Sequence, residues 1–234
     1  MSSPRNGTTI RPKDQLSGPR LENGARVGVV GGGPAGSFFA YFLLRLAETV
    51  GRDIAVDIYE PRDFASPAPL GCNMCGGIVS ESLVQLLAAE GIILPPTVIQ
   101  RGIDSYVLHM DVGQVRIDTP LHEMRIGAVH RGAGPRDIKN VRWESFDHHL
   151  QSLAVGAGAE IIRGRVDSLS LDDGHPQVMT RDGKGGVYDL LTVAVGVNSG
   201  ALKLLEGLGL GYQPPKTTKT YIREYFLGED VVQR

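Results

Sequence analysis

The sequence predicts an α/β domain built on a parallel sheet, and three consecutive stretches support this. The apolar run 27–30 has the composition of a buried strand and ends among closely spaced glycines. Residues 37–49 are apolar on nearly all sides, as expected for a helix enclosed within an α/β domain. Residues 54–59 form a second strand. The order strand, helix, strand therefore predicts a βαβ unit.

The glycines after the first strand predict a turn that holds a dinucleotide. Gly31 can make the tight turn, Gly33 lets the backbone approach a pyrophosphate, and Gly36 lets the helix pack closely on its strand. Pro34 suits the first helical turn, whose free N–H groups attract phosphate oxygens. Glu60 ends the second strand, where this fold places a carboxylate that binds a ribose. Together these residues predict a Rossmann-like domain.

Composition excludes several other classes of protein. The chain has 234 residues, is 41% hydrophobic and carries a net charge of −2, so it can bury a large core and has no electrostatic footprint for nucleic acid. It contains no apolar run long enough to span a membrane. Residues 1–25 are polar and lack the apolar core of a secretion signal, which predicts a disordered tail and a cytoplasmic protein.

The second half of the chain predicts antiparallel structure joined to the parallel sheet. Residues 105–118 alternate in polarity around a turn, as in a hairpin, and suggest a second layer that holds the substrate. Residues 145–155 have the apolar spacing of a helix. Strands are expected at 160–171 and 177–181, forming a meander with 187–195. The last of these is apolar on both faces and is predicted to lie buried in the parallel sheet.

Several of these segments together resemble the FAD-dependent oxidoreductases of the geranylgeranyl reductase and aromatic hydroxylase superfamily. The resemblance rests on residues 31–36 with Glu60, on the helix that starts at 145 with its following strand, and on residues 189–199. It covers most of the chain between 27 and 199. The segment Cys75-Gly76-Gly77 is similar to the Cys-Gly-Gly segment of geranylgeranyl reductases.

The resemblance implies FAD as the cofactor and a role for each matching residue. It implies pyrophosphate contacts from the glycine turn, a ribose contact from Glu60, an adenine contact from the backbone of Val166, and flavin-ring neighbours in the Cys-Gly-Gly segment. Arg142 either contacts the pyrophosphate, as an arginine before this helix does in the superfamily, or lies on the surface. The expected cofactor residues are Gly31, Gly33, Pro34, Ala35, Gly36, Glu60, Arg62, Cys75, Gly76, Gly77, Arg142, Val166 and Gly196.

The resemblance also predicts how the chain is divided. Residues 26–100 and 136–215 are expected to form the FAD-binding domain, a parallel sheet with a β-meander crossover. Residues 101–135 and 216–234 are expected to be parts of an antiparallel substrate domain. The superfamily's later Gly-Asp motif is missing, and Val195 replaces the Asp of its Ala-Asp-Gly segment. We therefore expect the N-terminal part of a longer protein, which alone binds FAD weakly and does not turn over.

The expected reaction is the reduction of carbon–carbon double bonds in an isoprenoid or similar apolar substrate. Electrons would come from NAD(P)H or ferredoxin, and because the flavin carries the chemistry, the sequence identifies no catalytic residue. The alternatives are a flavin monooxygenase, a nicotinamide-dependent dehydrogenase that uses the same glycine turn, and a non-catalytic dinucleotide-binding module. The expected partners are the apolar substrate and a peripheral membrane contact, with no nucleic acid.

No metal site is predicted from the cysteines or histidines. Cys72 and Cys75 lack the second ligand pair that zinc requires, so they are either a redox dithiol or part of an ordinary flavin-facing loop. His148 and His149 are neighbours on a predicted helix and point about 100° apart, so they cannot chelate one ion together.

Overall fold

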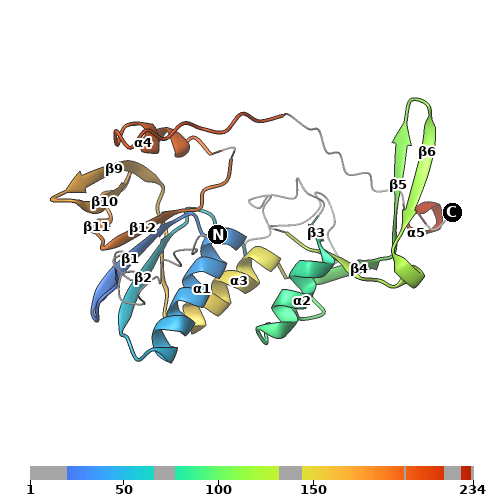
Figure 1. Cartoon of the computed structure of the whole chain (residues 1–234), viewed down its shortest axis with the longest axis horizontal. Helices are drawn as coiled ribbons and strands as arrows, with labels where there is room; N and C mark the ends of the chain where they lie inside the picture. Colours follow the sequence, from blue (N-terminus) through green and yellow to red (C-terminus); the bar gives the residue numbers. More distant parts are fainter. Residues whose placement is uncertain (1–19, 66–76, 132–143, 198, 219–227, 233–234) are drawn as a thin grey trace, which may run out of the picture.

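A computed structural model describes residues 20–65, 77–131, 144–197, 199–218 and 228–232. A four-stranded parallel sheet with the order β12-β1-β2-β8 organises the fold (Figure 1). Its strands are β1 (Ala25–Val30), β2 (Ile54–Tyr59), β8 (Glu160–Ile162) and β12 (Leu190–Val193). The predicted βαβ unit is confirmed.

Two helices cover one face of the parallel sheet, where the main core lies. They are α1 (Pro34–Thr49) and α3 (Phe146–Gly156), which pack side by side (Figure 1). Side chains alternate along a strand, so β1 and β2 each send every second residue toward the helices. The buried residues of this core are Val27, Val29, Ala40, Leu44, Val56, Ile58, Ala154 and Ala159. The predicted helix 145–155 is confirmed, with Ser145 as its N-cap.

An antiparallel sheet covers the opposite face of the parallel sheet. Its strands, in the order β11-β10-β9, are β9 (Val166–Asp172), β10 (His175–Thr180) and β11 (Gly185–Val187). They form the expected meander. Val30 and Tyr59 of the parallel sheet share a buried cluster with Val166, Val178 and Tyr188. The result is three layers, with helices, parallel sheet and meander stacked on one another.

A buried polar network joins the meander to the parallel sheet. The hydroxyl of Tyr188 donates to Asp57 Oδ2 at 2.8 Å, and the hydroxyls of Tyr59 and Tyr188 lie 2.5 Å apart. Arg26 pairs with the same carboxylate oxygen at 3.0 Å, and its guanidinium lies over the Tyr188 ring. Burial raises the pKa of both tyrosines, so both remain neutral hydroxyls. Every polar group in this network has a partner, as a buried site requires.

Three sequence predictions need correction. The strand expected at 160–171 is two strands, because β8 joins the parallel sheet and β9 the meander. The strand expected at 187–195 is shorter and is not buried on both faces, because β12 is the edge strand and its Leu190 is 37% exposed. The predicted tail 1–25 reaches too far: Gly24 donates its N–H to the carbonyl of Asp53, and β1 starts at Ala25. Residues 1–19 lie outside the described part.

The rest of the described chain forms a second, smaller group of elements. Strands β3 (Ile78–Val79), β7 (Ile126–Val129) and β4 (Ile99–Ile103) make an antiparallel sheet that packs with α2 (Glu81–Ala89). The predicted hairpin is confirmed as β5 (Ser105–Met110) and β6 (Gly113–Asp118). The short helices are η2 (Pro120–His122), α4 (Leu202–Glu206) and α5 (Glu229–Val232). Among the helices described, none is both long and apolar enough to cross a membrane. The division into domains stays a prediction.

The polar network predicts the effect of removing one hydroxyl. Replacing Tyr188 with Phe should lower the free energy of unfolding by about 1–3 kcal/mol, because Asp57 loses a donor and Tyr59 loses its acceptor. The matched control, Tyr59→Phe, removes only the bond between the two tyrosines and should cost less. Urea denaturation measures both variants. A Tyr188→Phe protein as stable as the parent would mean that the network does not stabilise the fold.

Candidate functional site

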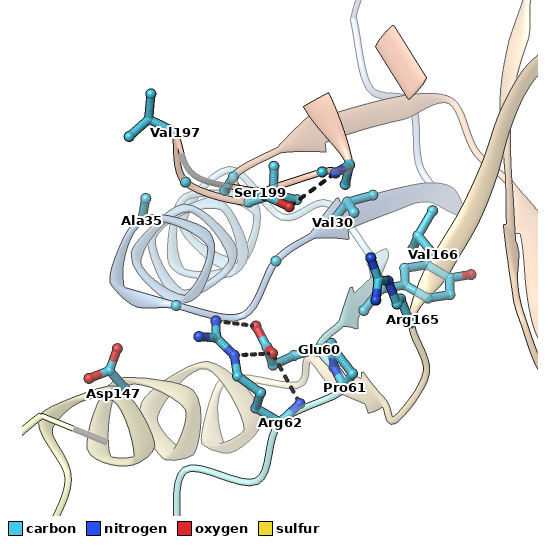
Figure 2. A pocket seen from close by; sticks show the side chains of 18 of the residues that line it. Val30, Ala35, Glu60, Pro61, Arg62, Asp147, Arg165, Val166, Val197 and Ser199 are labelled. Atoms are coloured by element: carbon cyan, nitrogen blue, oxygen red, sulfur yellow. Dashed lines mark hydrogen bonds and ion pairs between the residues drawn. The ribbon is translucent and has the colours of Figure 1, made fainter. Parts of the chain in front are cut away.

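A cavity of about 790 Å³ opens at the carboxyl ends of the parallel strands (Figure 2). Its wall is formed by the β1–α1 turn, the segment after β2, the start of β9 and the turn after β12. Ligands of open α/β sheets bind at this edge, and the volume is within the usual range for ligand pockets. The lining includes Val30, Gly31, Gly33, Pro34, Ala35, Tyr59, Glu60, Pro61, Arg62, Arg131, Asp147, Arg165, Val166, Asp167, Gly196 and Ser199.

The glycines of the β1–α1 turn have the three geometries that the sequence predicts. Gly31 has a φ of +103°, and a Cβ there would lie 2.6 Å from the carbonyl oxygen of Ala194. A Cβ on Gly36 would lie 1.9 Å from the carbonyl oxygen of Gly31, so helix and turn approach too closely for a side chain. A Cβ on Gly33 would meet no atom within 4 Å, because this residue faces open space. A ligand can therefore reach the backbone at Gly33.

Helix α1 presents its N-terminus to the cavity. Gly33 is its N-cap and provides no side-chain cap, Pro34 occupies the first turn, and no acidic residue lies in that turn. The first N–H groups of a helix have no partner within the helix, and the helix dipole makes this end positive. Ala35, in the same turn, is exposed on the cavity wall. This end of α1 is therefore suited to an anion such as a diphosphate.

Glu60 is almost completely buried and is surrounded by hydrogen-bond donors. Its side chain is 2% exposed and accepts from the N–H of Gly32 at 3.0 Å. Arg62 donates to it from its backbone N–H at 3.0 Å and from Nε at 2.9 Å, as Figure 2 shows. The Arg62 guanidinium also lies over the Phe64 ring. Any hydroxyl group that binds Glu60 would share the carboxylate with Arg62.

Sequence reasoning missed the role of Gly32, which holds the turn in place. Its carbonyl accepts hydrogen bonds from Ser37 Oγ and Gln151 Nε2, each at 3.0 Å. A Cβ on this residue would lie 2.6 Å from Gln151 Nε2 and 2.8 Å from the Cβ of Glu60. The sequence marks Gly32 only as one of three consecutive glycines. Its importance becomes visible only when β2 and α3 are placed beside it.

The structure brings most of the predicted cofactor residues to this one cavity. Those in the lining are Gly31, Gly33, Pro34, Ala35, Glu60, Arg62, Val166 and Gly196. Gly36 lies just beneath the turn. Gly77 lies elsewhere: it precedes β3, and its carbonyl accepts from the N–H of Val129. Cys72, Cys75, Gly76 and Arg142 are outside the described residues. That these residues contact a cofactor stays a prediction.

The sequence also did not identify several charged residues of the cavity wall. Arg131 and Asp147 form an ion pair at 2.7 Å there, and Arg165 and Asp167 flank Val166. Only Asp147 could have been noticed in the sequence, because it is an acidic residue in the first turn of a predicted helix, where a negative charge is favourable. Nothing in the sequence marks Arg131 as its partner. No cluster of three or more potential metal ligands occurs in the part of the chain that is described.

Solved structures of a halogenase and of a Diels-Alderase share this fold. The halogenase PltM matches with a TM-score of 0.51 and 17% identity over 78% of this chain and 36% of that chain. PltM in complex with phloroglucinol and FAD matches with a TM-score of 0.50 and 15% identity, over 78% of this chain and 36% of that chain. The Diels-Alderase PyrE3, from pyrroindomycin biosynthesis, matches with a TM-score of 0.50 and 18% identity, over 78% of this chain and 34% of that chain. No protein-family model and no curated protein sequence matches.

These likenesses establish the fold alone. The chain spans about a third of the length of these three solved structures. The shared part has a mixed α/β arrangement with a parallel sheet, as the sequence predicts.

The turn geometry predicts different effects of the same substitution at two glycines. Gly36→Ala should lower the free energy of unfolding by about 1–3 kcal/mol or more, because the new Cβ overlaps the carbonyl oxygen of Gly31. Gly33→Ala should change it by less than about 1 kcal/mol, because the new methyl group enters open space. Thermal and urea unfolding compare the two variants. Equal destabilisation would contradict the assigned geometry.

Proposed function

We propose that this chain forms the FAD-binding part of a flavin-dependent oxidoreductase. The observation that carries the proposal is the cavity at the carboxyl ends of β1 and β2, where the open Gly33, the N-terminus of α1 and the carboxylate of Glu60 meet. The shared fold supports it, since PltM was crystallised with FAD. FAD, when bound, supplies the transfer of a hydride or of electrons.

The residues of the cavity fit the ADP half of such a cofactor. The diphosphate would receive N–H groups from the start of α1, where Gly33 leaves room for it. Glu60 would accept hydrogen bonds from the ribose. The adenine would lie against the backbone at Val166, the first residue of β9, which closes the opposite side of the cavity (Figure 2). The protein thereby binds and orients the nucleotide.

A nicotinamide dinucleotide could use the same glycine turn, so the cofactor needs a direct test. FAD is favoured because the turn at Gly196 and the antiparallel elements are features of FAD-type domains and are unnecessary in a simple nicotinamide-binding fold. We expect the purified full-length protein to carry a chromophore with the visible bands of flavin, and denaturation to release FAD. A colourless protein that binds NAD tightly would contradict the proposal.

The proposed reaction is reduction of carbon–carbon double bonds in an isoprenoid or similar apolar substrate, with NAD(P)H or ferredoxin as the external reductant. The motif behind this choice, Cys75-Gly76-Gly77, lies mostly outside the described residues. A flavin monooxygenase is the second candidate, and the fold shared with the halogenase PltM favours it equally. A non-catalytic nucleotide-binding module is the third.

Turnover without oxygen separates these candidates. The full-length protein, reduced under anaerobic conditions and mixed with a prenyl substrate, should form a product with fewer double bonds. A monooxygenase gives no product until oxygen is admitted, and then consumes oxygen in step with hydroxylated product. A binding module gives no product under either condition. Mass spectrometry of the substrate, with an oxygen electrode, distinguishes the three outcomes.

Gly33 provides a test of cofactor binding that leaves the fold intact. Gly33→Ala should weaken the binding of both FAD and ADP about tenfold or more, because its methyl group occupies the path of the diphosphate. The matched control is Gly156→Ala, which also adds a methyl group where no atom lies within 4 Å, but at the far end of α3. Calorimetric titration measures both. Unchanged affinity in Gly33→Ala would place the diphosphate elsewhere.

A further inference from the structure

A largely buried ion pair in the cavity wall has no role in the binding scheme above. Arg131 Nε donates to Asp147 Oδ2 at 2.9 Å, and Arg131 Nη2 donates to Oδ1 at 2.7 Å. The side chains are 19% and 3% exposed. This is a bidentate pair, in which the planar guanidinium is fixed relative to the carboxylate. Both residues line the same cavity as Gly33 and Glu60.

The two members of the pair come from different parts of the molecule. Arg131 follows β7 of the antiparallel sheet by two residues, whereas Asp147 lies in the first turn of α3, which packs on the parallel sheet. A backbone bond runs beside the pair, because the N–H of Phe146 donates to the carbonyl of His130 at 2.7 Å. The antiparallel sheet is therefore attached to α3 at the cavity wall.

The position of the pair relates it to one end of a bound dinucleotide. Figure 2 places Asp147 on the side of α1 that carries Ala35, whereas Val166 and Arg165 lie on the opposite side of the cavity. A nucleotide with its adenine at Val166 and its diphosphate at Ala35 would reach Asp147 and Arg131 last. The part of the cofactor nearest to them is then the part beyond ADP.

We propose that Arg131, positioned by Asp147, recognises the part of the dinucleotide beyond ADP, through the oxygens of its ribityl chain. This inference rests on the proposed function. A guanidinium has five N–H donors, and the fork to Asp147 orients the whole group. An oriented donor adds affinity because little side-chain freedom is lost on binding. Arg131 thereby distinguishes FAD from ADP, and it does so from the antiparallel sheet.

The test compares the affinities of the full-length protein, freed of cofactor, for FAD and for ADP. In Arg131→Gln, FAD affinity should fall about tenfold or more, while ADP affinity stays within about twofold. Retained ADP binding also shows that the cavity is intact. Equal losses for both ligands would assign the pair a structural role only, and no loss for either would show that Arg131 does not touch the cofactor. Both results overturn the proposal.

Two further variants sharpen the comparison. Arg131→Lys keeps the charge but cannot form the fork, so it should also lose FAD affinity selectively, by a smaller factor. If Arg131→Gln does not fold, Arg131→Lys still tests whether Arg131 recognises FAD selectively. The matched control is Arg181→Gln, which breaks the exposed pair with Asp167 at the opposite end of the cavity (3.1 Å; 68% and 50% exposed) and should leave the FAD-to-ADP ratio unchanged.

The parent protein distinguishes failure of this inference from failure of the proposed function. If the parent binds ADP and FAD equally well, the flavin half contributes nothing and Arg131 has nothing to recognise. If the parent binds NAD in preference to FAD, the proposed cofactor is wrong. A parent that prefers FAD to ADP, together with Arg131 variants that lose this preference, agrees with both the proposed function and this inference.

Discussion

The hydrogen bond from the N–H of Gly32 to Glu60 is the interaction on which the candidate site depends. It joins the β1–α1 turn to the end of β2, while the carbonyl of the same glycine is held by Gln151 of α3 and Ser37 of α1. All of these groups are buried, so each would be costly to leave without a partner. One glycine thereby fixes the relative positions of two strands and two helices at the edge of the sheet where the cavity opens.

This arrangement also determines the electrostatics of the cavity. Glu60 is paired with Arg62, and Asp147 with Arg131, so the buried carboxylates of the wall are already balanced by guanidinium groups. A diphosphate that enters is then attracted chiefly by the N-terminus of α1, which has no acidic residue in its first turn. The carboxylate of Glu60 can accept from neutral hydroxyl groups without repelling the phosphates strongly. The site therefore suits a ligand that has a diol beside a diphosphate.

The parts of the fold that depend on local sequence could be predicted, and those that depend on distant partners could not. The spacing of Gly31, Gly33 and Gly36 predicts a turn and a close approach, and both are present because these are properties of a few adjacent residues. The apolar run at 187–195 predicts a strand but not its place, since an edge strand and a central strand have similar composition. The break between β8 and β9 separates strands of two different sheets, which alternation alone does not distinguish.

The same reasoning explains why the ion pair of Arg131 and Asp147 could not be predicted from the sequence. Their side chains meet only because the antiparallel sheet and α3 converge at the cavity, and no motif relates the end of β7 to the start of α3. A buried ion pair adds little net stability, since desolvation offsets most of the attraction. A hydrophobic contact would join the antiparallel sheet to α3 as well. What the ion pair provides instead is a guanidinium of defined orientation in the cavity wall, so that the segment after β7 contributes directly to the site where the cofactor is proposed to bind.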